Sequence, residues 1–303
     1  MEAGLVEQGR DRSVGHANKV GYGKRFIGKK RKPYRRVRRS PTVSKASKEL
    51  FVSCRDTFKG PDTVPSSHDV QKLCHILDAV EPEDFGLSSD LHFFKPGNVF
   101  RENPRVTYTS VYQCENFSLC IFFLPATAVI PLHNHPGMTV FSKLLLGQMH
   151  IKSYDLVDPI IPETSENTSR PSQLKLAKLK TDKVFNSPCN TSVLYPTTGG
   201  NIHEFTAITP CAVLDVIGPP YSKQDGRDCS YYRDHPYTAF SNGEINRAWA
   251  KDENGRFGWL EEIERPENSQ MDGIEYLGPP IIEPGSELDL VSESKLLQRE
   301  FEF

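Results

Sequence analysis

Between residues 44 and 80, hydrophobic and polar positions are spaced as in helices. We expect one helix over residues 44–58 and a second that begins at Ser66 and Ser67, because serine is well suited to cap a helix N-terminus. The apolar residues that follow recur three or four positions apart and therefore share one helical face. This stripe consists of Val70, Leu73, Leu77 and Val80. We interpret both helices as packing elements and not as a ligand site.

From residue 107 onward the pattern changes to short runs rich in β-branched and aromatic residues. Turn residues, notably Gly147 and the pair Gly199 and Gly200, separate these runs, and no regular helices lie between them. Such a pattern predicts a mainly β sandwich or barrel. The predicted strands are residues 107–112, 117–124, 139–146, 149–155, 174–179, 192–194, 203–208 and 212–217.

Three further segments have weaker patterns. Residues 158–173 are polar and contain proline, so we expect a surface loop there. After Pro219 the chain is expected to be irregular, with a short helix or strand at residues 259–263. No apolar stretch approaches the roughly 18 residues that a membrane span needs, and the first 19 residues have no apolar signal-peptide core.

The distribution of charged residues divides the chain into chemically different parts. The 303 residues are 37% hydrophobic and 25% charged, which suits one large core. Residues 1–48 contain 15 Lys and Arg against 3 acidic residues, whereas the remainder contains 22 against 36. We therefore predict a disordered basic arm over residues 1–43, one folded domain over 44–285, and a flexible acidic tail over 286–303.

The basic arm has three interpretations. Residues 29–39 resemble a nuclear import signal, which gives an expected location in the nucleus and cytoplasm. A solubilising tail is the plain alternative, and phosphate neutralisation on a nucleic acid is the third. Only Phe26 and Tyr34 interleave with the basic residues, so nucleic-acid binding is not expected. Seven cysteines without a Cys-x-x-Cys pair argue against a zinc ribbon or a disulfide framework.

The triplet His133-Asn134-His135 ends an apolar run and is the first candidate for chemistry. Residues i and i+2 of a strand point to the same face, so both imidazoles can aim at one point inside a barrel. No carboxylate occurs between His135 and Tyr154. A metal site here would therefore use neutral, histidine-only ligands. Two partly solvated histidines near a loop are the alternative.

The third ligand is expected to be His203. Gly199 and Gly200 allow a tight turn with positive φ, after which the chain re-enters an extended run. His203 would then open a strand that faces the same cavity as the first two histidines. Imidazole suits iron, zinc, copper and nickel alike, so three histidines do not by themselves choose the metal.

These motifs give the chain its resemblance to a known family. His133-x-His135, Gly147 and Gly200-x-x-His203 resemble the two cupin motifs, except that Thr139 and Val140 stand where the usual glutamate would be. Loss of that glutamate is typical of thiol dioxygenases. Together with residues 132–138, 214–221 and 226–232, the motifs resemble the plant cysteine oxidases and their relative cysteamine dioxygenase over residues 45–285.

The resemblance implies both a fold and an activity. The fold would be a cupin-like double-stranded β-helix, or jelly-roll barrel, with a few N-terminal packing helices. The enzyme would use one Fe(II) per chain and O2 to convert an N-terminal cysteine to cysteine sulfinic acid, which is not reversed in most settings. In plants the substrates would be transcription factors of the low-oxygen response, and sulfination would commit them to the N-degron pathway.

Four further residues are candidates for the same pocket. Asp215 lies in the apolar run 212–217, where a carboxylate either faces a cavity, near the substrate amine or a ligand histidine, or lies on a solvated strand face. Tyr221 follows a rigid Gly-Pro-Pro turn and either aims its hydroxyl at the site or caps the barrel mouth. Cys229 and Tyr231 are kept as pocket residues, and we do not expect them to be covalently linked. Three other histidines, His92, His150 and His235, are expected to be structural or exposed.

Two competing functions remain open from the residues. A zinc or other divalent-metal cupin would perform isomerase or hydrolytic chemistry with the same three histidines. A non-catalytic cupin would use its basic arm as a nucleic-acid-binding regulator. The protein is expected to be a monomer with no membrane partner.

Overall fold

The computed structural model describes residues 43–95, 104–157, 174–240 and 256–282 of the chain. Two units divide the chain, Met1–Arg39 and Ser40–Phe303, and all described residues belong to the second. Residues 1–42 of the predicted basic arm, the whole predicted loop at 158–173 and the predicted acidic tail lie outside the described residues. None of the described helices is long and apolar enough to cross a membrane.

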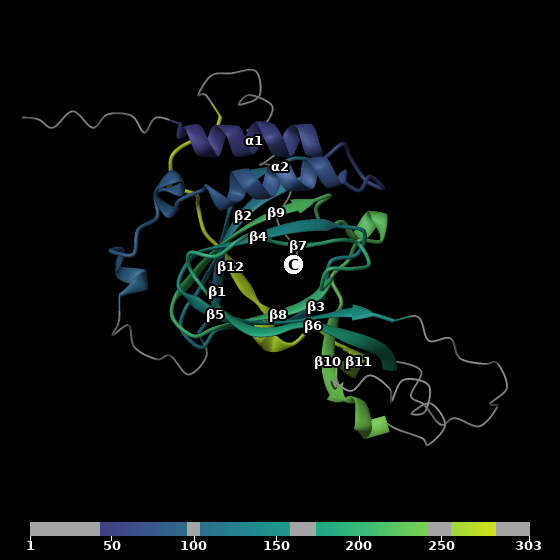
Figure 1. Cartoon of the computed structure of the whole chain (residues 1–303). Helices are drawn as coiled ribbons and strands as arrows, with labels where there is room; N and C mark the ends of the chain where they lie inside the picture. The colour runs from purple at the N-terminus through teal and green to yellow at the C-terminus, as the bar shows by residue number, and fades with distance from the viewer. Residues whose placement is uncertain (1–42, 96–103, 158–173, 241–255, 283–303) are drawn as a thin grey trace, which may run out of the picture. The chain divides into compact units, whose positions relative to one another are not determined.

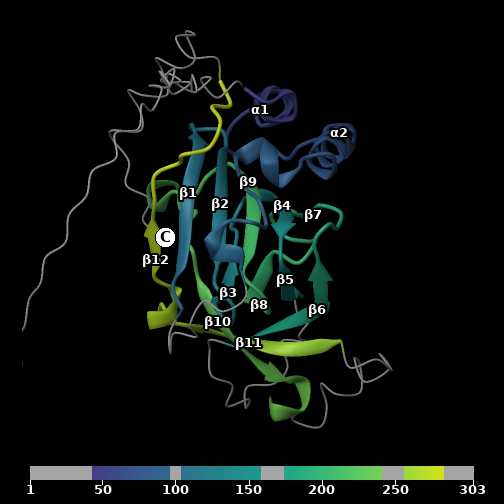
Figure 2. The same cartoon turned by 90° about the vertical axis from the view of Figure 1, so that its left-hand side faces the viewer.

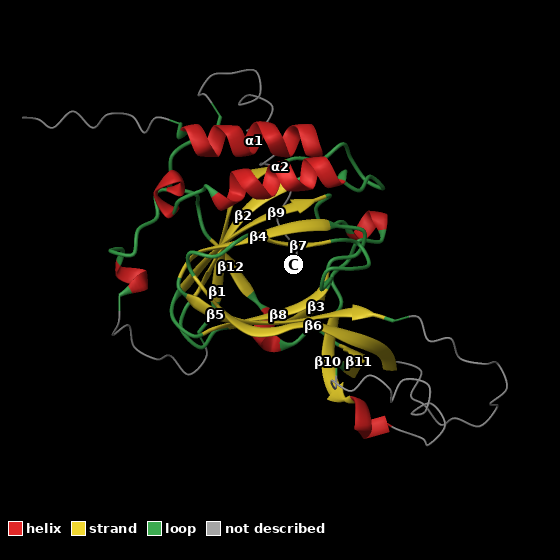
Figure 3. Ribbon diagram, viewed as in Figure 1, coloured by secondary structure: helices red, strands yellow, loops and turns green. Residues whose placement is uncertain are grey.

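Two α-helices and two short 3-10 helices precede a series of twelve strands in the part of the chain that the structure describes (Figure 3). The α-helices are α1 (Lys45–Thr57) and α2 (Ser67–Asp78). The strands are β1 (Val106–Gln113), β2 (Ser118–Leu124), β3 (Val129–Asn134), β4 (Thr139–Leu146), β5 (Gln148–Leu156), β6 (Leu174–Asn186), β7 (Ser192–Leu194), β8 (Ile202–Ala207), β9 (Cys211–Gly218), β10 (Tyr231–Pro236), β11 (Phe257–Ile263) and β12 (Met271–Gly273).

Both helices begin at a serine cap, which the sequence predicted for the second helix. The Ser44 hydroxyl accepts a hydrogen bond from the Ser47 amide at 3.1 Å, and the Ser66 hydroxyl accepts one from the Asp69 amide at 3.2 Å. These bonds satisfy amide groups that the first helical turn leaves without partners. The predicted apolar stripe of α2 is buried from Val70 to Val80.

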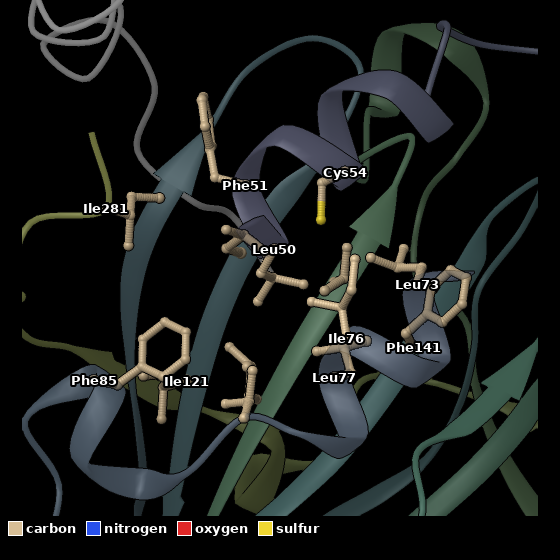
Figure 4. Close-up of a cluster of buried hydrophobic side chains, with 14 of the residues drawn as sticks. Leu50, Phe51, Cys54, Leu73, Ile76, Leu77, Phe85, Ile121, Phe141 and Ile281 are labelled. Carbon is tan, nitrogen blue, oxygen red and sulfur yellow. The ribbon is translucent and has the colours of Figure 1, made fainter. Parts of the chain in front are cut away.

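The helices cover one face of the first sheet. This sheet has the strand order β12-β1-β2-β9-β4-β7, and α1 and α2 lie across its outer side in both views (Figures 1 and 2). Figure 4 shows helix residues such as Leu50 and Leu77 meeting the sheet residues Ile121 and Phe141. Burial of this apolar surface, at about 25 cal/mol per Å², fixes the helices on the sheet.

The second sheet closes on itself. Its strand order is β10-β11-β6-β5-β8-β3, and pairing of Tyr231 on β10 with His133 on β3 completes the ring. A second core lies between the two sheets, because alternate residues of β2, β9, β3 and β8 point inward. Its members include Phe122, Val213, Ile130 and Phe205. The predicted mainly β, cupin-like barrel with N-terminal packing helices is confirmed.

Two details of the strand prediction were wrong. β6 extends to Asn186 instead of ending at residue 179, because its polar second half pairs along β5. The chain after Pro219 is more regular than expected, since β10 pairs with β11 over its full length and β12 pairs with β1. The short run at 259–263 belongs to β11, so its strand alternative is confirmed.

Candidate active site

Three histidines from two regions of the sequence converge inside the barrel. His133 on β3 pairs directly with His203 on β8, so their side chains share one face of the sheet. His135 lies one residue beyond the end of β3, in the turn that leads to β4. One ligand atom from each ring lies within 4.8 Å of the others, and all three residues are buried.

A β-bulge in β3 aims His133 into the cavity. The pairing of β3 with β8 shifts by one residue between Ile130 and His133, so both side chains face inward although they are three positions apart. Pro131 lies within the bulge and has no amide hydrogen to give to a strand ladder. The simple alternation expected from the sequence is therefore interrupted just before the histidine pair.

The separation of two ring nitrogens suits ligands of one metal ion. Nε2 of His135 lies 3.0 Å from Nε2 of His203. Two imidazole nitrogens that each bind one ion at about 2.1 Å can be no more than about 4.2 Å apart, and this pair meets that condition. The ring centroids of the three histidines are 4.8 to 4.9 Å from one another.

Hydrogen bonds fix the tautomers of two of the three rings. Nδ1 of His133 lies 2.8 Å from the Pro131 carbonyl, which only accepts, so this nitrogen carries the hydrogen. The Tyr221 hydroxyl donates to the Asn134 carbonyl at 2.8 Å and lies 2.9 Å from Nδ1 of His135. Since that hydroxyl has only one hydrogen, Nδ1 of His135 must donate to it. Both rings therefore keep the Nε2 lone pair free for a metal.

Burial keeps the three imidazoles neutral. It lowers the pKa of His133 from 6.5 to about 4 and lowers the pKa of His135 and of His203 well below the usual value. His203 and His133 lower the pKa of His135 further, and His133 lowers that of His203, since a second positive charge nearby is unfavourable. Neutral imidazole is the form that binds a metal, so the donor set fits a divalent cation at neutral pH.

No carboxylate joins this cluster among the described residues. Thr139 and Val140, which occupy the positions of the usual cupin glutamate, are buried residues of β4. A metal held by three neutral ligands would keep its full positive charge. Such a site is suited to an anionic substrate group such as a thiolate.

Asp215 faces the same cavity and is 4% exposed. It pairs with Cys120 on β2 and Ser142 on β4, and its Oδ1 has no hydrogen-bond partner in the described part of the chain. Burial raises the pKa of Asp215 to about 7, and a hydrogen bond from Ser142 opposes part of this rise. The solvated-face alternative was therefore wrong, and no hydrogen bond joins Asp215 to the three histidines within the described residues.

The other predicted pocket residues also line the cavity. Tyr221 reaches the site by contacting the outer nitrogen of His135. Cys229 lies between two phenols and interacts with the hydroxyls of Tyr221 and Tyr231. Burial raises the pKa of the Cys229 thiol to about 11, so it is neutral at physiological pH.

The cavity wall includes residues that the sequence did not single out. The cavity has a volume of about 420 Å³, including open solvent at its mouth. The apolar part of the wall comes from strands of both sheets, so no local motif could have revealed it. These residues are Phe122, Ile130, Phe205, Ile217 and Met271.

His92, His150 and His235 are structural or exposed, as expected. His150 Nε2 lies 2.7 Å from Asp182, and His235 Nε2 lies 2.9 Å from Glu261. His92 is exposed in a short 3-10 helix. All three are outside the cavity lining.

Comparison with known proteins gives a consistent result. Residues 76–281 match the family described as PCO_ADO. Plant cysteine oxidases 1 and 2 of Arabidopsis thaliana are 46% and 48% identical over 242 and 238 residues, which is 78% of this chain and 80% and 83% of those proteins. The 2-aminoethanethiol dioxygenase of Mus musculus is 29% identical over 254 residues, 75% of this chain and 92% of that protein.

Among solved structures, an uncharacterised protein with a double-stranded β-helix domain from Klebsiella pneumoniae superposes with a TM-score of 0.28. The identity is 13%, and the match covers 48% of this chain and 94% of that one.

Proposed function

This chain belongs to the PCO_ADO family of thiol dioxygenases, and we propose that it oxidises a cysteine at the N-terminus of a peptide or protein to cysteine sulfinic acid. The reaction adds both atoms of O2 to the thiol, so that RSH and O2 give RSO2H and no other oxidant or reductant is consumed. The relatives named above are oxidases or dioxygenases of small thiols or cysteine.

The observation that carries the proposal is the convergence of three buried, neutral histidines without a carboxylate among them. We propose that His133, His135 and His203 hold Fe(II) through Nε2. When bound, the iron would supply a positive centre at which a thiolate and O2 meet. The choice of iron rests on the family, since imidazole nitrogens also suit zinc.

We propose that Asp215 binds the α-amine of the substrate. Its carboxyl group shares the cavity with the histidines and has an oxygen without a partner among the described residues. A substrate ammonium placed beside it would favour the ionised carboxylate, because opposite charges stabilise each other. This role would select a cysteine with a free amine next to its thiol.

We propose that Tyr221 fixes the ring of His135. Its hydroxyl accepts the Nδ1 hydrogen and donates to the Asn134 carbonyl, which holds both the tautomer and the ring orientation. Cys229 and Tyr231 complete the wall on this side of the cavity.

Our proposal for the physiological substrates is based on the family resemblance. We propose transcription factors of the low-oxygen response that expose an N-terminal cysteine and enter the N-degron pathway after sulfination. Residues 29–39 support a location in both nucleus and cytoplasm. A reporter with an N-terminal cysteine should be degraded faster in air when this enzyme is present, and a reporter with an N-terminal alanine should be unaffected.

Mass spectrometry of a Cys-initiated peptide tests the proposed activity. The Fe(II)-loaded protein should add two oxygen atoms to the peptide in air, and the zinc-loaded protein should add none. The same peptide beginning with alanine is the control. Sulfination that is equally fast without iron would contradict the proposal, and turnover only with zinc, on another class of substrate, would favour the isomerase or hydrolase alternative.

A further inference from the structure

We propose that Asn201 and Asp155 are positioning residues that set the distance between His135 and His203. The inference rests on the proposed metal site. It concerns two side chains that the sequence motifs did not single out, one on the turn before β8 and the other on β5.

His135 needs a partner because it lies beyond the strand ladder. The pairing of β3 with β8 stops at Asn134 opposite Ile202, which are the last residue of β3 and the first residue of β8. Continued by one residue, this register would place His135 opposite Asn201. At that position, the side chain of Asn201 makes the hydrogen bonds to the His135 backbone that a strand backbone would otherwise make.

The carboxamide of Asn201 binds both backbone groups of His135. Its Oδ1 accepts from the His135 amide at 3.2 Å, and its Nδ2 donates to the His135 carbonyl at 2.8 Å. The second Nδ2 hydrogen is donated to the Tyr195 carbonyl at 2.7 Å. Only one amide orientation satisfies all three bonds, since a flipped group would place donor against donor. Asn201 is 7% exposed, so water is a poor substitute for these partners.

Asp155 fixes the turn that carries Asn201. Its Oδ1 accepts from the amides of Gly200 at 2.7 Å and Asn201 at 3.2 Å, and its Oδ2 accepts from Gly199 at 3.1 Å. Asp155 is 9% exposed, and Lys180 Nζ lies 3.5 Å from its Oδ2. One carboxylate therefore ties three successive amides of the turn to β5.

The turn cannot easily shift to another conformation. Gly199 and Gly200 have φ of +84° and +88°, which favour glycine. A Cβ at Gly200 would also lie 2.6 Å from the Ser153 hydroxyl. The position of Asn201, and two residues later that of His203, is thus set by β5.

Two independent constraints consequently act on His135. Tyr221 holds its ring through Nδ1, and Asn201 holds its backbone. Loss of Asn201 would leave the ring attached to Tyr221 and the His135 carbonyl bonded to the Met138 amide at 3.3 Å. The His135 amide would lose its partner, and the tie between His135 and the turn before β8 would be broken, so the 3.0 Å separation from Nε2 of His203 would be less well fixed. Removal of such outer partners of metal ligands typically costs about 10- to 100-fold in metal affinity.

The experiment measures Co(II) binding by metal-free protein under anaerobic conditions. Asn201→Ala removes all three hydrogen bonds, and Asn201→Asp keeps the shape but loses the donors to both carbonyls. We expect both variants to bind Co(II) about 10- to 100-fold more weakly, with a changed visible spectrum of the bound ion. Asp155→Asn keeps part of the capacity to accept hydrogen bonds, so its Co(II) affinity should fall less than that of the Asn201 variants.

Asn190→Ala is the matched control, because Asn190 is exposed and outside the site. It should bind Co(II) like the wild type. Thermal melting of each metal-free variant separates positioning from folding. Unchanged Co(II) affinity and spectrum in folded Asn201→Asp would overturn the inference, even if its melting temperature fell. Failure of the wild type itself to bind Co(II) would instead contradict the proposed metal site.

Discussion

Replacement of Asp215 by Asn is expected to stabilise the metal-free protein at neutral pH and to slow the enzyme. Asp215 is 4% exposed, and its Oδ1 has no hydrogen-bond partner among the described residues. Burial raises its pKa from 3.8 to about 7. The folded protein therefore either keeps a proton on this carboxyl or holds a poorly paired buried charge. An asparagine side chain at this position has the same shape and avoids that cost.

The magnitude follows from the difference between the folded and unfolded pKa of Asp215. At about pH 4 and below, both states are protonated and the group contributes no pH dependence. Between about pH 4 and pH 7 the unfolded chain loses its proton while the folded protein retains it, so stability falls by about 1.4 kcal/mol per pH unit. The loss reaches on the order of 4 kcal/mol above the folded pKa of about 7. About 3 kcal/mol of it falls between pH 5 and pH 8.

Urea unfolding of both metal-free proteins across this pH range measures the effect. The difference in unfolding free energy removes the contribution of groups that the two proteins share. Relative to the wild type, Asp215→Asn should gain about 3 kcal/mol between pH 5 and pH 8. A difference that does not vary with pH would refute the reasoning, because it would mean that Asp215 is ionised and well paired in the folded state. With iron bound, the variant should turn over peptide more slowly at equal iron occupancy, and an unchanged rate at saturating peptide would remove Asp215 from the proposed amine-binding role.

Three further predictions address the ligands, the substrate and the arm. His203→Ala should lose most of its bound iron, measured by metal analysis, and more than about 100-fold of its activity, while its circular dichroism spectrum is preserved. Full activity of this variant would remove His203 from the ligand set. N-acetylation of a Cys-initiated peptide should reduce sulfination at least about tenfold in a mass-spectrometric assay, because the amine contact is lost, and equal rates would mean that the amine plays no part. Deletion of residues 1–43 should leave iron binding and peptide oxidation nearly unchanged but lower the nuclear fraction of a large fluorescent fusion, and an unaltered distribution would contradict the import signal.

The sequence was most informative where one short motif determines a local structure. The cap at Ser66 and the glycine turn before His203 each depend on neighbouring residues, and the structure has them as predicted. The clustering of His133, His135 and His203 could be predicted because strand alternation and a barrel topology are enough to suggest it.

The remaining features depend on contacts between distant segments. The bulge at Pro131 is defined only by its register against β8, and β10 exists because β3 and β11 flank it. Asn201 gave no signal of its own, since its partner His135 is 66 positions away. Met271 enters the cavity only because β12 pairs with β1.

Oxidation of a Cys-initiated peptide in a mixture of ordinary and heavy-isotope O2 tests the central claim most directly. A dioxygenase centre at the three histidines should deliver both atoms of one O2 molecule to one sulfur. Mass spectrometry should then show sulfinic acid with two light or two heavy oxygen atoms, and its formation should depend on bound iron. Product that contains one light and one heavy atom as its main form, or that forms equally with His203→Ala, would contradict the account.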